Sequence, residues 1–219
     1  MPTHHRIPTL DLTWTPDSAP GVERKLLTGP DAEEGLTTSI ARLVAGAVLP
    51  GSGGADGVGR ELLVLDGELL AGEAELARGD YLRQPVAGEL STESGCTVYL
   101  KEGAFGPEDR EITLVRFAEE PWLPGQGNLR VRPLHSFATG GTAYVHWPAG
   151  ERFVPHRHFG GEEILVISGT FIDEHGEYPE GTWLRSPHLR AHHPFVQEET
   201  VIFVKTGHLN AVASGDSSG

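Results

Sequence analysis

An internal repeat constrains this chain more than any other feature of its sequence. Four blocks of the first half recur in the same order in the second half, two of them at an offset of 102 residues and the others at 104 and 108. Arg60–Glu68 and Gly79–Pro85 align with Glu162–Thr170 and Gly181–Pro187, and Val98–Gly103 and Trp14–Pro16 align with Ile202–Gly207 and Trp122–Pro124. Matched blocks in one order rarely arise by chance. The sequence therefore predicts two copies of one unit of about 100 residues, joined near residues 107–121.

Short apolar segments separated by turns predict an all-β fold. Segments rich in β-branched or apolar residues are Ile40–Val48, Leu62–Leu65, Cys96–Leu100, Thr142–Trp147, Ile164–Ile167 and Thr200–Lys205. Pairs such as Asp66-Gly67 and Ser168-Gly169 end them with turn chemistry, and no stretch keeps a 3.6-residue apolar period. Between the copies, Ile112–Phe117 is apolar and predicts one further strand.

Charge and cysteine content exclude several classes of protein. The chain has 17 Lys plus Arg against 31 Asp plus Glu, a net charge of −14, which disfavours a nucleic-acid partner. It has no apolar run long enough to cross a membrane and no secretory h-region at its N-terminus, so we expect no membrane association. Its single cysteine, Cys96, cannot form an internal disulfide, and we expect a cytoplasmic protein.

Histidines concentrate in the second copy. None lies between Arg6 and Leu134, and nine of the eleven lie from His135 onward. His156 and His158, at positions i and i+2, would share one face of a strand, and Glu162 follows after the next turn. His192 or its neighbour His193 could add a third imidazole, because adjacent strand residues face opposite ways and only one can point inward.

Imidazoles with one carboxylate suit Zn²⁺, Fe²⁺, Mn²⁺, Ni²⁺ or Cu²⁺ better than Ca²⁺ or Mg²⁺. Glu163 competes with Glu162 for the same geometric reason that His193 competes with His192. The alternative to a metal centre is a polar barrel mouth, which would leave converging polar groups unpaired at a cost. The other histidines, His135, His146, His175, His188 and His208, are expected to have surface or packing roles, although His146 could line the pocket.

The spacing in the second copy resembles a known family. The run Gly150-x5-His156-x-His158-x3-Glu162-x6-Gly169 matches the first cupin motif, and Pro179-x-Gly181 with a later His resembles the second. The stretches Gly160–Val166 and Gly169–Pro179 are especially similar to the C-terminal cupin of ChrR-type anti-sigma factors. This resemblance implies two tandem double-stranded β-helix (jelly-roll) barrels, a bicupin.

In that family three His and one Glu hold a metal, usually zinc as isolated. Carried over to this sequence, the metal ligands are His156, His158, Glu162 and His192, and the motif spacing favours Glu162 over Glu163. The resemblance therefore implies one divalent transition metal per chain, with Zn²⁺ expected as isolated and Fe²⁺, Mn²⁺ or Ni²⁺ as alternatives.

The first copy departs from this pattern. Gly54, Asp56, Arg60 and Leu90 stand at the four ligand positions, so we expect a metal-free barrel. The expected organisation is an N-terminal tail (1–11), a degenerate cupin domain (12–111), a metal-binding cupin domain (112–210) and a disordered tail (211–219). ChrR-type proteins begin with a helical zinc domain that grips the sigma factor. No such segment precedes the first copy here, so direct sigma-factor binding is not expected.

Three functions follow as hypotheses. The first is a metal-binding cupin that binds a small molecule or senses an oxidant in a stress response. The second is an Fe²⁺-dependent dioxygenase acting on a small diketone or hydroxy-ketone. The third, a sugar epimerase or isomerase, would not need the His and Glu residues. Because cupins often pair through sheet edges, we also expect that the chain could form a homodimer.

Overall fold

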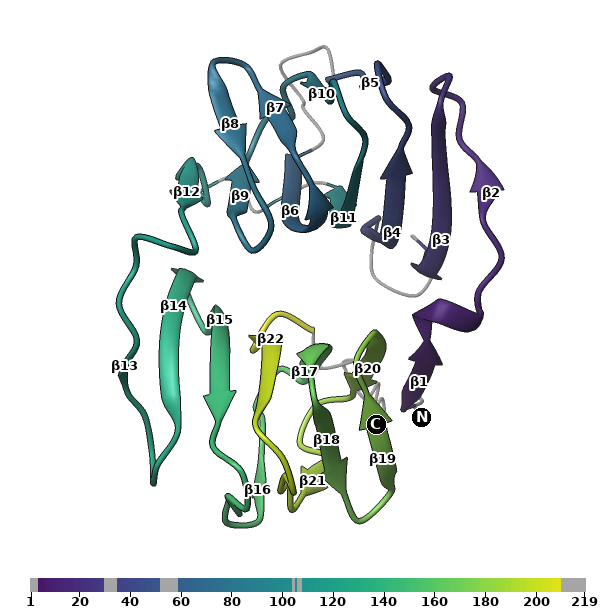
Figure 1. Ribbon diagram of the computed structural model, residues 1–219. Coiled ribbons are helices and arrows are strands. Elements are labelled where there is room, and N and C mark those ends of the chain that lie inside the picture. Colours follow the sequence, from purple (N-terminus) through teal and green to yellow (C-terminus); the bar gives the residue numbers. More distant parts are fainter. Residues whose placement is uncertain (1–3, 30–34, 52–58, 104, 106–107, 210–219) are drawn as a thin grey trace, which may run out of the picture. The chain divides into compact units, whose positions relative to one another are not determined.

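The protein folds into two compact units of β-strands (Figure 1). The computed structural model describes residues 4–29, 35–51, 59–103, 105 and 108–209. One unit comprises Asp11–Glu120, and the other combines Met1–Leu10 with Pro121–Gly219. We call them the first and the second unit. Within the described residues the only helical element is η1, a 3-10 turn at Thr9–Asp11, so the predicted all-β class is confirmed.

The first unit contains two antiparallel sheets. Its strands are β2 (Thr15–Pro16), β3 (Val22–Thr28), β4 (Thr37–Leu43), β5 (Val48–Leu49), β6 (Gly59–Gly67), β7 (Leu69–Ala71), β8 (Ala74–Leu76), β9 (Tyr81–Gln84), β10 (Leu90–Ser91), β11 (Cys96–Gly103) and β12 (Thr113–Val115). The larger sheet has the order β12-β9-β6-β11-β4-β3-β2, and the smaller one β5-β10-β7-β8. Their facing sides enclose the core of the unit.

The second unit repeats this arrangement. Its strands are β1 (His5–Pro8), β13 (Leu123–Pro124), β14 (Arg130–Phe137), β15 (Gly140–Trp147), β16 (His156–Arg157), β17 (Glu162–Ser168), β18 (Thr170–Asp173), β19 (Gly176–Pro179), β20 (Thr182–Ser186), β21 (Ala191–His192) and β22 (Thr200–Thr206). The larger sheet has the order β1-β20-β17-β22-β15-β14-β13, and two strand pairs, β16-β21 and β18-β19, lie apart from it. Each strand of this unit thus has a counterpart in the first, as the repeat predicts.

Two edge strands belong to a different unit from the one that the sequence-based bounds predict. β1 comes first in the chain but pairs with β20 of the second unit, with Ile7 opposite Trp183. β12 follows the first unit's other strands and pairs with β9 of that unit, with Leu114 opposite Leu82. The sequence-based bounds assigned residues 1–11 to a tail and residues from 112 to the second barrel. The structure differs because each segment covers an otherwise open sheet edge with backbone hydrogen bonds.

The cores of the two units differ in composition. The first unit is filled by small and aliphatic side chains, including Leu62, Leu90 and Leu100, which are fully buried. The core of the second unit contains several aromatic rings, including Trp147, Phe171 and Tyr178, with Phe153 packed against it. Trp147 and Phe171 are buried, and Phe153 is partly buried. The second unit therefore has an aromatic interior where the first has a hydrocarbon one.

The predicted strand at Ile40–Val48 is too long. β4 ends at Leu43, because Gly46 takes a φ of 77° in a turn whose Ala47 N–H donates to the Val44 carbonyl. The expected disorder of residues 211–219 lies outside the described residues. Within the described ranges, no helix is long and apolar enough to span a membrane.

Candidate metal centre

Three short segments of the second unit bring the predicted metal ligands together. β16 and β21 are antiparallel and place His156 directly opposite His192. His158 follows β16 by one residue, and Glu162 is the first residue of β17. Gly160 and Gly161 both adopt positive φ between them, which turns the chain sharply from His158 back into the sheet.

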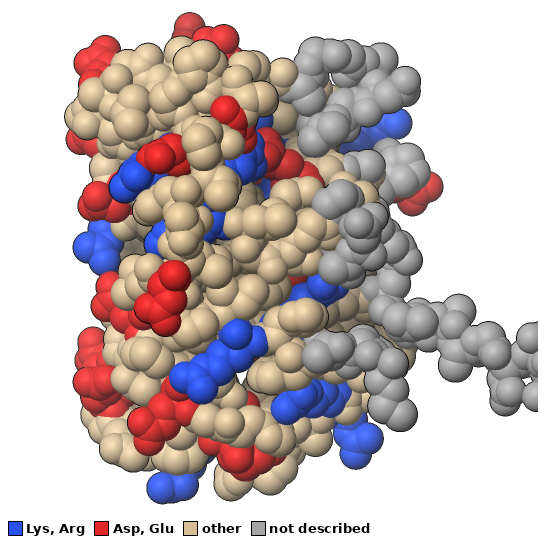
Figure 2. All heavy atoms as spheres, turned by 90° about the vertical axis from the view of Figure 1, so that its right-hand side faces the viewer, with Lys and Arg blue, Asp and Glu red and all other residues tan. Residues whose placement is uncertain are grey.

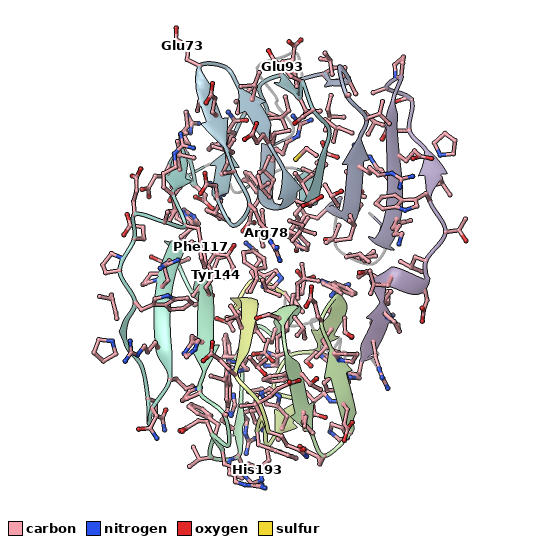
Figure 3. The ribbon with its side chains drawn as sticks, viewed as in Figure 1. Glu73, Arg78, Glu93, Phe117, Tyr144 and His193 are labelled. Carbon is pink, nitrogen blue, oxygen red and sulfur yellow. The ribbon has the colours of Figure 1, made fainter. Side chains whose placement is uncertain are left out.

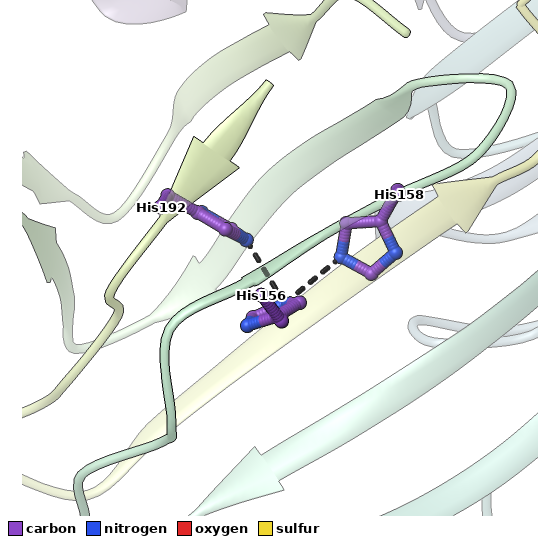
Figure 4. Close-up of side chains that lie close together, drawn as sticks. All are labelled: His156, His158 and His192. Atoms are coloured by element: carbon purple, nitrogen blue, oxygen red, sulfur yellow. Dashed lines mark hydrogen bonds between the residues drawn. The ribbon is translucent and has the colours of Figure 1, made fainter. Parts of the chain in front are cut away.

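The side chains converge through their ring nitrogens (Figure 4). The Nε2 atom of His156 lies 3.0 Å from that of His158 and 3.0 Å from that of His192. The ligand atoms of these three residues all lie within 4.8 Å of one another, a separation compatible with one metal ion. Glu162 completes the group, with its Oε1 3.1 Å from His158 Nε2 and its Oε2 3.7 Å from His192 Nε2.

Hydrogen bonding around His156 favours a metal over a purely polar cluster. Its Nδ1 lies 3.0 Å from the Val154 carbonyl oxygen, which can only accept, so the ring proton sits on Nδ1. Nε2 then carries a lone pair aimed at the other two imidazoles. In a tetrahedral site, Zn–N bonds of about 2.0–2.1 Å place neighbouring ligand nitrogens roughly 3.3 Å apart, which is close to the 3.0 Å that separate His156 Nε2 from the other two Nε2 atoms. The donor set therefore fits a divalent transition metal.

Burial and charge set the protonation of the four groups. Burial lowers the pKa of His156 and of His192, so both favour the neutral form that binds metals. Burial opposes ionisation of Glu162, but the hydrogen bond and charge of His158 outweigh it and hold the pKa of the carboxyl below its usual value. The same contact raises the pKa of His158 against the opposing effect of burial. The site thus keeps one carboxylate among imidazoles.

The two competing residues face away from this cluster. His193 is exposed at the periphery of the second unit (Figure 3), and its backbone N–H donates to Glu174. Glu163 Oε2 lies 3.2 Å from His208 Nε2 instead. Strand alternation explains why His193 and Glu163 point away from the cluster, because their neighbours His192 and Glu162 occupy the inward positions.

The remaining histidines lie outside the cluster. His146 is beside Glu199 and Trp122, on the face of β15 opposite the core residue Trp147, so it does not line the site. His188 accepts a hydrogen bond from the Gly160 N–H and thereby supports the turn that follows His158. The sequence missed the role of His188 and of the Val154 carbonyl, since backbone partners leave no mark in a residue pattern.

Among the described residues of the first unit, the positions equivalent to the candidate metal ligands hold no cluster of imidazoles and carboxylates. Leu90, at the position of His192, is fully buried in hydrocarbon. Arg60, at the position of Glu162, is buried and pairs with Glu102 at 2.9 Å. Gly54 and Asp56, which the offset of 102 residues aligns with His156 and His158, lie outside the described residues.

Comparison with known proteins agrees with a chain made of two copies of one domain. The family model described as the ChrR cupin-like domain matches the chain twice, over residues 2–106 and 110–210. No curated protein sequence matches the chain significantly.

Solved structures show the same fold at low sequence identity. A “putative dioxygenase” from Nostoc punctiforme superposes with a TM-score of 0.78 at 14% identity, covering 94% of this chain and 82% of that one. The protein Ylba from E. coli gives a TM-score of 0.77 at 11% identity, covering 95% and 93%. A variant of oxalate decarboxylase from Bacillus subtilis gives 0.66 at 13% identity, covering 92% and 76%. At these identities the likeness concerns the fold alone, and it confirms the predicted tandem jelly-roll architecture.

Proposed function

Because the chain belongs to the ChrR cupin-like domain family through two successive copies, we propose that it is a bicupin that binds one divalent transition metal, in the second unit only. The metal ligands are His156, His158, Glu162 and His192. The observation that carries this proposal is the convergence of three imidazole Nε2 atoms on one another next to a buried carboxylate. Zn²⁺ is the metal expected in protein as isolated.

The role we propose for this centre is to bind a small molecule or to respond to an oxidant, in a stress response. When bound, the metal would supply a Lewis acid to which an oxygen atom of a small molecule can attach. The protein's own groups orient this site. The Val154 carbonyl fixes the tautomer of His156, and Glu162 offsets the positive charge of the ion. The rings of Phe153 and Phe171 flank His156 and His192 and keep water from that side.

Surface charge supports a small-molecule partner over a nucleic acid. On the face drawn in Figure 2, basic side chains are interspersed with acidic ones, and the chain as a whole carries a net charge of −14. The single cysteine, Cys96, is buried and free, which is consistent with a protein of the reducing cytoplasm. A homodimer is part of the proposal, to be checked by light scattering.

Metal analysis of protein made without an affinity tag tests the proposal. We expect about one metal per chain, and X-ray absorption at the metal edge should show three nitrogen ligands and at least one oxygen ligand. Glu162→Gln should lose most of the metal, whereas the matched control Glu163→Gln should retain it. Two metals per chain, or none after growth with added metal, would contradict the proposal.

The second candidate is an Fe²⁺-dependent dioxygenase acting on a small diketone or hydroxy-ketone. It is favoured by the structural neighbour described as a dioxygenase, which covers 94% of this chain. Four protein ligands on a six-coordinate iron leave two positions for other groups, whereas Zn²⁺ with the same four ligands would take a small molecule only by expanding to five-coordination. Oxygen uptake by protein loaded with Fe²⁺ under anaerobic conditions, then mixed with air and acetylacetone, supports this candidate. Unchanged oxygen levels favour the non-catalytic function.

A further inference from the structure

The turn between His158 and Glu162 joins two of the proposed metal ligands. The chain reverses direction there before it enters β17 (Figure 4). Its central residues, Gly160 and Gly161, are buried, and both adopt a positive φ. The positions of these two ligands relative to each other therefore depend on how the backbone of the turn is fixed.

Hydrogen bonds fix the two glycines of this turn. Their carbonyl groups are paired with main-chain amides, Gly160 with the Leu209 N–H at 2.7 Å and Gly161 with the Gly207 N–H at 3.1 Å. The Gly160 N–H is instead paired with a side chain, since it donates to Nδ1 of His188 at 2.9 Å. Gly160 is buried, and a buried amide that loses its acceptor raises the free energy of the conformation that holds it.

The segment that supplies His188 also leads to the third imidazole ligand. Residues 187–190 form a turn that continues into β21, which carries His192. The Leu189 N–H of this turn donates to the His158 carbonyl at 2.9 Å. Leu189 has a φ of 59°, which leucine rarely adopts, and it is 43% exposed, so burial of its side chain does not explain this conformation. Two adjacent residues of the turn thus bond to the segment that carries the other ligands.

The first unit lacks the side chain that makes this contact. At the offset of 102 residues Val86 stands where the second unit has His188, and a valine side chain offers no acceptor. The next residue, Ala87, does not share the positive φ of its counterpart. Arg60 holds this part of the first unit instead, by donating to the Gly88 carbonyl at 2.8 Å. The acceptor is therefore absent from the unit that also lacks the metal ligands.

We propose that His188 is a positioning residue of the metal centre. By accepting the Gly160 N–H, it fixes the turn between His158 and Glu162 against the segment that carries His192. This inference rests on the proposed function, because it concerns how the proposed metal is held. His188 is not itself a ligand, since its Nδ1 is occupied by the Gly160 N–H and its neutral ring then carries the proton on Nε2.

Metal affinity of full-length variants tests this role. In His188→Leu the acceptor is lost, and the affinity for Zn²⁺, measured by competition with a chromophoric chelator, should fall about tenfold or more. His188→Asn should bind as tightly as the wild type, because its side-chain oxygen is bonded to Cγ as Nδ1 is and can accept the same N–H. His146→Leu is the matched control, since it removes a histidine of the same unit that lies outside the cluster, and it should keep the wild-type affinity.

Cobalt substitution distinguishes positioning from a general loss of stability. The visible absorption of bound Co²⁺ depends on the number and geometry of its ligands. The spectrum of Co²⁺-loaded His188→Leu should therefore differ from that of the wild type, and the spectrum of His188→Asn should match it. A role in stability alone would lower the free energy of unfolding of the metal-free protein and leave the spectrum unchanged. If the leucine variant does not fold, His188→Ala, which also lacks an acceptor, replaces it.

The outcomes separate this inference from the proposed function. If the wild-type protein binds no metal, the proposed function fails and this inference fails with it. If the wild type binds zinc and His188→Leu keeps either its affinity or its cobalt spectrum, only this inference is overturned. Equal weakening in His188→Leu and His188→Asn also overturns it, because the acceptor is then not what holds the turn.

Discussion

Arg60 donates a guanidinium N–H to the main-chain carbonyl of Gly88 across 2.8 Å. A second N–H of the same group reaches the carbonyl of Pro50 at 3.0 Å. Pro50 follows β5 and Gly88 lies just before β10, and these strands correspond to β16 and β21 in the second unit. Arg60 itself occupies the position of Glu162. In the first unit, hydrogen bonds from one cation therefore connect the elements that a metal would connect in the second.

The first prediction concerns Arg60→Met. It should lower the free energy of unfolding by about 3 kcal/mol, because two carbonyls lose their donor and Glu102 loses a buried partner. Urea denaturation measures this change. Arg42→Met is the matched control. The Arg42 side chain is 43% exposed where it pairs with Glu23, so this ion pair should contribute only about 1 kcal/mol to the free energy of unfolding. Equal losses in the two variants would contradict the assigned role of Arg60.

The second prediction concerns His192→Leu, which introduces the residue found at the same position of the first unit. We expect metal affinity to fall by more than about 100-fold, since losing even a residue that only supports a metal ligand costs roughly 10–100-fold. Mass spectrometry of the metal content tests this. His193→Leu removes the exposed neighbouring imidazole and should leave about one metal per chain. A loss of metal in His193→Leu but not in His192→Leu would reverse the assignment.

The third prediction concerns Cys96 on β11, which is only 4% exposed. Burial, assisted by the charge of Asp66, raises the pKa of the thiol to about 12. The folded protein should therefore resist iodoacetamide at pH 8 and react fully in urea. Rapid alkylation of the folded protein would show that the thiol is accessible.

The raised pKa of Cys96 also predicts how the stability of the protein depends on pH. Below the ordinary thiol pKa of about 8.5 the group is protonated in both states and contributes no pH dependence. Above it the unfolded state loses the proton first, so stability falls as pH rises, by about 2 kcal/mol at pH 10. Cys96→Ala should remove this part of the slope in urea denaturation between pH 8 and pH 10.

The sequence predicted the all-β class, the two successive copies and the approximate positions of several strands, among them β6, β11 and β17, because the repeat and the turn residues are local patterns. The resemblance to the cupin motifs also predicted the four residues that meet at the candidate metal centre, whereas strand alternation alone left His193 and Glu163 as alternatives. The sequence did not predict that β1 pairs with β20, or that β12 pairs with β9. Those pairings depend on which sheet edge is open in the folded unit, and no local pattern records that.

Backbone atoms explain most of what was missed at the site. The Val154 carbonyl orients His156, and the carbonyls of Pro50 and Gly88 hold Arg60. Every residue carries a carbonyl, so its identity says nothing about this role. The alignment showed that Arg60 replaces a carboxylate, but its partners became visible only in the structure.

The last prediction concerns removal of the metal. A bound metal stabilises only the state that holds it, by about 2.7 kcal/mol when its free concentration is about 100 times the dissociation constant. Chelation should therefore increase hydrogen exchange in β16, β17 and β21 of the second unit, measured by mass spectrometry. Their counterparts β5, β6 and β10 should keep their protection, because Arg60 holds them without a metal. In Arg60→Met this pattern should change: β5 and β10 should exchange faster even with metal present, while the second unit keeps its response to chelation. Equal responses of both units to chelation would show that the metal does not act on the second unit alone.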